Sequence, residues 1–128
     1  MDIRSSKDMV AQADAAVRTL GPEQAVKLAG DPNTVFVDVR ESGEVQKSGT
    51  LSGAVHAPRG FLEFMADPAS PRHLSELSPG KQVVVFCGSG QRSALAARTL
   101  KEMGYPNVAH VAGGFGALKQ AGGEISGG

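Results

Sequence analysis

The sequence is poor in the residues that mark several classes of protein. It has one cysteine, no tryptophan and one tyrosine among 128 residues. A single cysteine excludes a disulfide within the chain and any metal site built from paired cysteines. The three histidines, His56, His73 and His110, are far apart and are not spaced as ligands on one helix. We therefore expect no metal and no other cofactor, and we interpret His56 and His110, which lie in expected strands, as structural.

An excess of charge of one sign and long apolar runs are missing as well. Thirteen Lys and Arg residues balance thirteen Asp and Glu residues, so no net charge draws the chain to nucleic acid or to an anionic membrane. No stretch is long and apolar enough to cross a bilayer. The first twenty residues carry scattered charges, which is unlike a secretory signal. We therefore expect a soluble, cytoplasmic protein, and a reducing compartment would also keep a free thiol usable.

Strands and helices alternate along the chain, which has the length of one domain. The runs "TVFVDVR" and "KQVVVFC" are short, apolar and rich in β-branched residues, and "GAVHAP" and "NVAHVAGG" read as briefer strands. Helical spacing predicts helices over residues 7–20, after Pro22 and from about Arg92 to Gly104. Residues 67–80 read as a surface loop with one helical turn at 73–77. This alternation favours a parallel sheet covered by helices on both faces.

The only cysteine, Cys87, stands at the carboxyl end of the strongest strand and opens the turn "CGSGQRS". Gly88 and Gly90 can adopt backbone angles that a side chain forbids. Such a turn can aim successive N–H groups inward, and the helix from about Arg92 adds its positive end. These surroundings lower the pKa of a thiol and favour a nucleophile. Without the turn, a lone cysteine after an apolar run is usually a small core residue.

Four short blocks of the sequence follow one another in a characteristic order. They are "FVDVRE", "GAVHAP", "CGSGQRS" and "HVAGGFGAL". They resemble the D-x-R-E segment, the G-A-x-x-x-P strand, the C-x-x-G-x-R loop and the closing double glycine of the rhodanese family of sulfurtransferases. The resemblance implies a small α/β domain over residues 21–121 with a central parallel sheet of about five strands. We expect an N-terminal helical extension over residues 1–20 and a flexible tail over residues 122–128.

The resemblance implies transfer of a sulfane sulfur through a persulfide on Cys87. The donor would be thiosulfate or another persulfide, and the acceptor a nucleophilic small molecule or protein. The persulfide would be held by the N–H groups of the loop, formed by Gly88, Ser89, Gly90, Gln91 and Arg92. Because positions 88, 89 and 91 lack the basic residue that many thiosulfate-using members carry, a persulfide donor is favoured over thiosulfate. The sequence leaves the oligomeric state open.

Supporting roles are expected at the same sheet edge, because ligand sites of parallel sheets lie at the carboxyl ends of the strands. Asp38 is expected to hold the loop or an arginine. Arg40 is interpreted as a rim cation for an anionic donor or as a partner of Glu41. Arg59 either lines the mouth of the site or is solvated. Arg92 either contacts the loop or donor, or caps the helix or pairs with Asp38.

Two other functions fit parts of the pattern. A domain of this fold can serve as a non-catalytic binding or regulatory module, although such domains often lose the cysteine that this chain keeps. Cysteine-dependent phosphatases use a related loop, but theirs has five residues between cysteine and arginine, whereas four intervene here. The shorter loop makes a smaller cradle, which suits a persulfide sulfur better than a tetrahedral phosphate.

Overall fold

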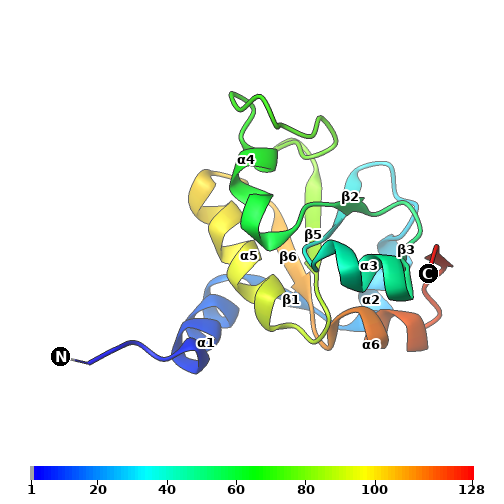
Figure 1. The fold of residues 1–128 in the computed structure, drawn as a ribbon, viewed down its shortest axis with the longest axis horizontal. Helices are drawn as coiled ribbons and strands as arrows, with labels where there is room; N and C mark the ends of the chain where they lie inside the picture. The colour runs from blue at the N-terminus through cyan, green and yellow to red at the C-terminus, as the bar shows by residue number, and fades with distance from the viewer. Residues whose placement is uncertain (1) are drawn as a thin grey trace.

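Helices and strands alternate through most of the chain in the computed structural model, which describes residues 2–128 (Figure 1). In chain order the elements are α1 (Ser6–Ala16), β1 (Arg18–Leu20), α2 (Pro22–Leu28), β2 (Thr34–Asp38), α3 (Ser42–Ser48), β3 (Thr50–Leu51), β4 (Val55–His56), the 3-10 helix η1 (Arg59–Phe61), α4 (Leu62–Ala66), β5 (Gln82–Phe86), α5 (Gln91–Met103), β6 (Val108–Val111), α6 (Gly114–Gln120) and β7 (Ile125–Ser126). Within residues 2–128 no helix is both long and apolar enough to cross a membrane.

A five-stranded parallel sheet forms the centre of the molecule, in the order β1-β6-β5-β2-β4. Helices α1, α4 and α5 cover one face, and α2 and α6 pack together on the other. Figure 1 shows α1 beside α5, with α6 on the far side of the strands from α4. The predicted α/β class and the parallel sheet of about five strands are confirmed.

The pleat of β5 sorts its side chains between two cores. Val83, Val85 and Cys87 enter the core beneath α4 and α5, whereas Val84 and Phe86 enter the core beneath α2 and α6. Successive side chains of a strand point to opposite faces. A strand buried on both faces therefore reads as a continuous apolar run, and the parity of each position decides which helices it meets.

The helix predicted over residues 7–20 is shorter than expected. It ends at Ala16, and Val17 adopts an extended conformation that leads into β1. Val17 then packs in the core beneath α5, whereas Leu20 packs in the core beneath α2. The helical spacing of these residues misled the prediction, because residues 18–20 instead pair with β6 as a strand and cover its edge.

The last residues form a second, small sheet. Thr50 and Leu51 of β3 pair antiparallel with Ser126 and Ile125 of β7. Ile125 packs against the core beneath α2 and α6. The sequence, which predicts a flexible tail over residues 122–128, gave no sign of this pairing, because two-residue strands carry almost no periodicity.

The long loop after α4 is anchored by a buried tyrosine. Residues 67–81 contain no helix, and the helical turn predicted at residues 73–77 is reduced to one turn, closed by the bond from the N–H of Leu77 to the carbonyl oxygen of Leu74 at 2.9 Å. The Tyr105 hydroxyl lies 2.8 Å from the carbonyl oxygen of Ala66 and 3.1 Å from that of Leu77, to which it donates. Burial, and then the charge of Asp67, raise the pKa of Tyr105, so the hydroxyl keeps its proton and remains a donor.

Replacing Tyr105 by Phe removes this donor while keeping the ring. The carbonyls of Ala66 and Leu77 lose a buried partner, which costs about 1–2 kcal/mol of the free energy of unfolding. Urea denaturation measures the loss, and limited proteolysis should show faster cleavage within residues 67–80. An unchanged urea midpoint would show that the hydroxyl does not anchor the loop.

Candidate active site

Three strands end together beneath the candidate site. In the sheet, Asp38 of β2 stands beside Phe86 of β5 on one side and His56 of β4 on the other. The segments that follow these strands therefore start from the same edge, as predicted for a parallel sheet. Cys87 is the first residue after β5.

The sulfur of Cys87 lies inside a ring of hydrogen-bond donors at the start of α5. Its Sγ accepts hydrogen bonds from the backbone N–H of Gly90, at 3.1 Å, and of Ser93, at 3.3 Å. The Ser93 hydroxyl lies 3.4 Å from the same sulfur. Gly90 has a φ of 108°, which a side chain would make costly, and this turn aims the first N–H groups of α5 back at the sulfur. The side chain of Cys87 is completely buried.

Two opposing effects act on the thiol. Burial raises the pKa of Cys87, because desolvation disfavours the thiolate. The side-chain hydrogen bond of Ser93 and the backbone N–H groups of Ser93, Gly90 and Ser89 lower it. The lowering outweighs burial, so the pKa of the Cys87 thiol lies below its ordinary value. The site thus stabilises a buried thiolate.

Glycines bring α6 against the backbone of the cysteine. Gly114 has a φ of 68°, and a Cβ there would lie 2.5 Å from the carbonyl oxygen of Cys87. The next residue, Phe115, donates its backbone N–H to that same oxygen at 2.7 Å. The expectation for Gly88 was wrong in one respect, because its φ is not positive. A side chain at Gly88 would instead press on Arg92, whose Nη2 lies 3.1 Å from the Cβ position.

Arg92 pairs with a carboxylate that the sequence did not single out. Its guanidinium makes two hydrogen bonds to Glu44 of α3, at 2.7 and 2.9 Å, rather than pairing with Asp38. The hydrogen bond from Arg92 lowers the pKa of Glu44 to about 2, so the pair is ionised throughout the neutral range. Both side chains are 40% exposed. The ion pair lies beside Gly88 and links the cysteine loop to α3.

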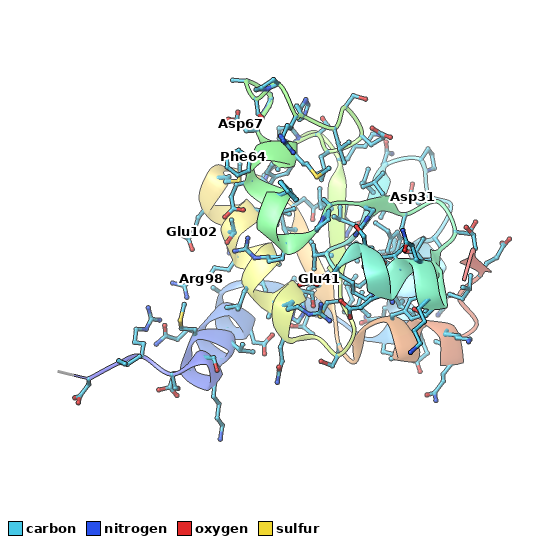
Figure 2. The ribbon with its side chains drawn as sticks, viewed as in Figure 1. Asp31, Glu41, Phe64, Asp67, Arg98 and Glu102 are labelled. Carbon is cyan, nitrogen blue, oxygen red and sulfur yellow. The ribbon has the colours of Figure 1, made fainter. Side chains whose placement is uncertain are left out.

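Three clefts border the loop that follows Cys87; besides the two described next, one of about 460 Å³ is lined by Ser6, Lys7, Val10, Gln91, Arg92 and Leu95. The first, of about 440 Å³, is lined by Val39, Glu41, Ser42, Gly43, Pro58, Arg59, Gly60, Phe61 and Arg92. The second, of about 350 Å³, is lined by Val10, Asp14, Thr19, Ser89, Gly90, Gln91, His110, Ala112 and Gly113. Arg59 therefore lines the mouth of a cleft, and its guanidinium also bonds Glu63 and Thr99. Figure 2 labels Glu41, at the start of α3, near the beginning of α5.

Asp38 and Arg40 do not join Cys87, which corrects their expected place in the site. Asp38 shares the register of Phe86, whose side chain points to the α6 face. Cys87 is one residue further along the chain and points to the α5 face. The two strands deliver their polar residues to one edge but to opposite faces of the sheet.

Arg40 is buried rather than placed on a rim. It is 3% exposed and bonds both carboxylate oxygens of Asp38, at 2.7 to 3.2 Å. It also donates to the carbonyl oxygen of Gly49 and lies 4.1 Å above the ring of Phe115. Asp38 thus holds an arginine, one of its two expected structural roles, whereas neither interpretation of Arg40 describes it. The pair joins β2 to α6 and to the turn before β3.

Both strand histidines have hydrogen-bond partners, and His110 has one at each ring nitrogen. His56 Nε2 lies 2.7 Å from the carbonyl oxygen of Arg40. His110 Nδ1 lies 3.1 Å from the Ser93 hydroxyl, and its Nε2 lies 2.7 Å from a carboxylate oxygen of Asp14. Sequence reasoning missed Ser93 and Asp14 as neighbours of the cysteine, although Ser93 directly follows the C-x-x-G-x-R pattern. Among residues 2–128 no group of three His, Cys, Asp or Glu side chains is arranged to hold a metal ion.

Comparison with known proteins identifies the family. A family model described as the rhodanese-like domain matches residues 21–121. The chain therefore belongs to the rhodanese-like domain family. It is 30% identical to the polysulfide-sulfur transferase homodimer of Wolinella succinogenes, with a TM-score of 0.75, covering 95% of this chain and 87% of that one.

Other relatives carry different functional descriptions. A Rhodopseudomonas palustris protein of unknown function, RPA3614, for which tyrosine phosphatase activity has been suggested, is 39% identical with a TM-score of 0.91, covering 98% of this chain and 97% of that one. The candidate sulfur carrier protein YrkF of Bacillus subtilis is 35% identical over 89 residues, which cover 70% of this chain and 43% of YrkF. A tRNA uridine(34) hydroxylase of Mesorhizobium japonicum is 35% identical over 104 residues, covering 80% of this chain and 32% of that enzyme. The chain spans less than half the length of these last two relatives.

Replacing Arg40 by Ala leaves the Asp38 carboxylate buried without its cation. Breaking a buried pair on one side costs about 3–5 kcal/mol of the free energy of unfolding. Arg98→Ala is the matched control, because Arg98 forms an exposed i,i+4 pair with Glu102 on α5 (Figure 2). Such a pair is worth at most about 1 kcal/mol. Equal losses for the two variants in urea denaturation would contradict a structural role for the Asp38–Arg40 pair.

Proposed function

We propose that the protein is a sulfurtransferase that carries a sulfane sulfur as a persulfide on Cys87. The observation that carries the proposal is the ring of donors from Gly90 and Ser93 around the only sulfhydryl of the chain. The same donors that favour a thiolate would favour the negative charge of a persulfide. Membership of the rhodanese-like family and similarity to a polysulfide-sulfur transferase support the same chemistry.

The transfer would take place in two displacements. The Cys87 thiolate attacks the outer sulfur of the donor and forms a sulfur–sulfur bond. The bond from that sulfur to the rest of the donor breaks, and its electron pair leaves with the donor as sulfite or a thiolate. A nucleophilic acceptor then attacks the terminal sulfur, and Cys87 leaves as a thiolate. No second cysteine is required when the acceptor comes from outside.

The cleft beside Arg92 favours a persulfide carried on a larger molecule over thiosulfate. Its two guanidinium groups, those of Arg59 and Arg92, are already paired with Glu63 and Glu44. The side chain of Glu41 adds a carboxylate to the same cleft. Little positive charge is left to attract a small dianion, whereas a volume of about 440 Å³ accommodates a peptide-sized thiol carrier.

Complete burial of the Cys87 side chain is the observation that favours the second candidate, a binding or regulatory module. Because none of the Cys87 side chain is exposed, a donor can reach the sulfur only if residues that cover it move. A module would leave the thiol covered, whereas a transferase must uncover it during each cycle. Sulfur uptake therefore discriminates between the two functions.

The test is a donor panel of thiosulfate, mercaptopyruvate, polysulfide and glutathione persulfide, followed by mass spectrometry. Wild-type protein should gain the mass of one sulfur atom, which cyanide or dithiothreitol removes, and glutathione persulfide should be a better donor than thiosulfate. Cys87→Ala should fold normally and gain nothing. Equal turnover by the wild type and Cys87→Ala would rule out Cys87 as the nucleophile.

An aryl phosphate assay is run on the wild type and on a Cys87→Ser variant. Phosphate release that is lost in the Cys87→Ser variant, together with no sulfur uptake from any donor, would replace the proposal with a phosphatase. The absence of both activities, together with protection of Cys87 from alkylation in the folded protein, would favour the binding module.

A further inference from the structure

His110 connects the candidate site to α1, the helix that precedes the residues matched by the family model. It lies on β6, where its neighbours across the sheet are Thr19 of β1 and Val85 of β5. Its side chain shares the face of the sheet that carries Cys87, because His110 stands beside Val85 in the register and Cys87 follows Val85 by two residues into the same core. It is 3% exposed, yet its ring meets polar groups from three other elements.

A continuous chain of contacts runs from a solvent-facing carboxylate to the buried sulfur. Asp14 Oδ1 lies 2.7 Å from His110 Nε2, and His110 Nδ1 lies 3.1 Å from Ser93 Oγ. Ser93 Oγ in turn lies 3.4 Å from Cys87 Sγ. Thr19 Oγ1 lies a further 3.2 Å from His110 Nε2. The side chain of Asp14 is 48% exposed, so this series of contacts reaches the solvent.

Every hydrogen bond in this series can be made with the thiol either protonated or ionised. With a neutral thiol, Cys87 donates to Ser93 Oγ, the Ser93 hydroxyl donates to His110 Nδ1, and Nε2–H donates to Asp14. When the sulfur ionises, its proton passes to Ser93 Oγ and the serine proton passes to His110 Nδ1. The hydroxyl then donates to the thiolate, and Nδ1–H donates to the hydroxyl. A thiolate and an imidazolium are formed, and the total number of protons is unchanged.

We propose that His110, held by Asp14, takes up the proton of Cys87 through the Ser93 hydroxyl. His110 and Asp14 are positioning residues in this scheme, because they act on the sulfur only through Ser93. The inference goes beyond sulfur transfer, since it concerns the ionisation of the thiol whatever donor or acceptor the protein uses. Asp14 lies on α1, outside the matched residues 21–121, so the carboxylate comes from a segment that the family model does not cover.

The charged groups at the two ends of this series of hydrogen bonds fix the direction in which the pH of thiolate formation should shift. Asp14 is the ionised group in contact with His110, and the residues beside His110 on the neighbouring strands, Thr19 and Val85, are uncharged. Arg92 of α5, with its partner Glu44 of α3, lies beside the loop of the cysteine. Removing the negative charge of Asp14 disfavours the imidazolium and therefore the thiolate. The thiolate should then form only at higher pH.

The experiment is the pH dependence of iodoacetamide alkylation, which reports on one site because Cys87 is the only cysteine. Wild type is compared with Asp14→Asn, which keeps the shape and removes the charge, and with His110→Gln. The matched controls are Asp8→Asn, exposed on the same helix, and His73→Gln, which lies outside all three clefts. Ultraviolet absorbance of the thiolate, with Cys87→Ser as the blank, measures ionisation independently of access.

Asp14→Asn and His110→Gln should be alkylated about tenfold more slowly than wild type at pH values below the midpoint of thiol ionisation. Well above that midpoint they should be alkylated as fast as wild type. The controls should follow the wild-type profile. An unchanged midpoint in both variants overturns the proposal, and so does a reduction that is equal at every pH, because that would be a purely structural effect. If His110→Gln fails to fold, the half-exposed Asp14→Asn decides alone.

The outcomes also separate this inference from the proposed function. Sulfur uptake by wild type with an unshifted midpoint in both Asp14→Asn and His110→Gln would refute only the proton route. A shifted midpoint without sulfur uptake from any donor would refute only the transferase.

Discussion

The first turn of α5 converges on one sulfur, and the other features of the site depend on that arrangement. Buried sulfur would normally hold its proton, because an uncompensated charge is expensive in a protein interior. The N–H groups of Gly90 and Ser93 offset this cost at 3.1 and 3.3 Å. The left-handed backbone at Gly90 is what turns these groups inward. The fold thus provides an anion site whose occupant is the side chain of Cys87.

Two elements around the loop, α6 and α3, keep this geometry in place. The backbone N–H of Phe115, at the start of α6, holds the carbonyl oxygen of the cysteine. The Arg92–Glu44 pair ties the loop to α3 from the solvent side. Both contacts restrain the loop without contacting the sulfur, so they help to preserve its hydrogen-bond donors. The buried Asp38–Arg40 pair lies at the same edge of the sheet but on its other face, toward α6. Residues that stabilise the fold and residues that surround the sulfur therefore occupy opposite faces of this edge.

Local chemistry was predictable from the sequence, and long-range geometry was not. The turn at Gly90, the helix that follows it and the sheet edge were expected, because glycine positions and apolar runs act over a few residues. The place of Arg40 was missed because it depends on the register of β2 against β5, which sets the face of each side chain. Glu44 and Asp14 were missed because only the packing of α3 and α1 brings them to the loop.

The most direct test of the central claim compares the Cys87 thiol in the folded chain with the same thiol in the chain unfolded by urea. Thiolate absorbance, titrated against pH with Cys87→Ser as the blank, gives both midpoints. Since the fold lowers the pKa of Cys87, the account predicts that thiolate forms at lower pH in the folded protein. Folding should then become more favourable as pH rises from the folded to the unfolded midpoint. A folded midpoint equal to or above the unfolded one would contradict the account, because burial would then outweigh the converging N–H groups.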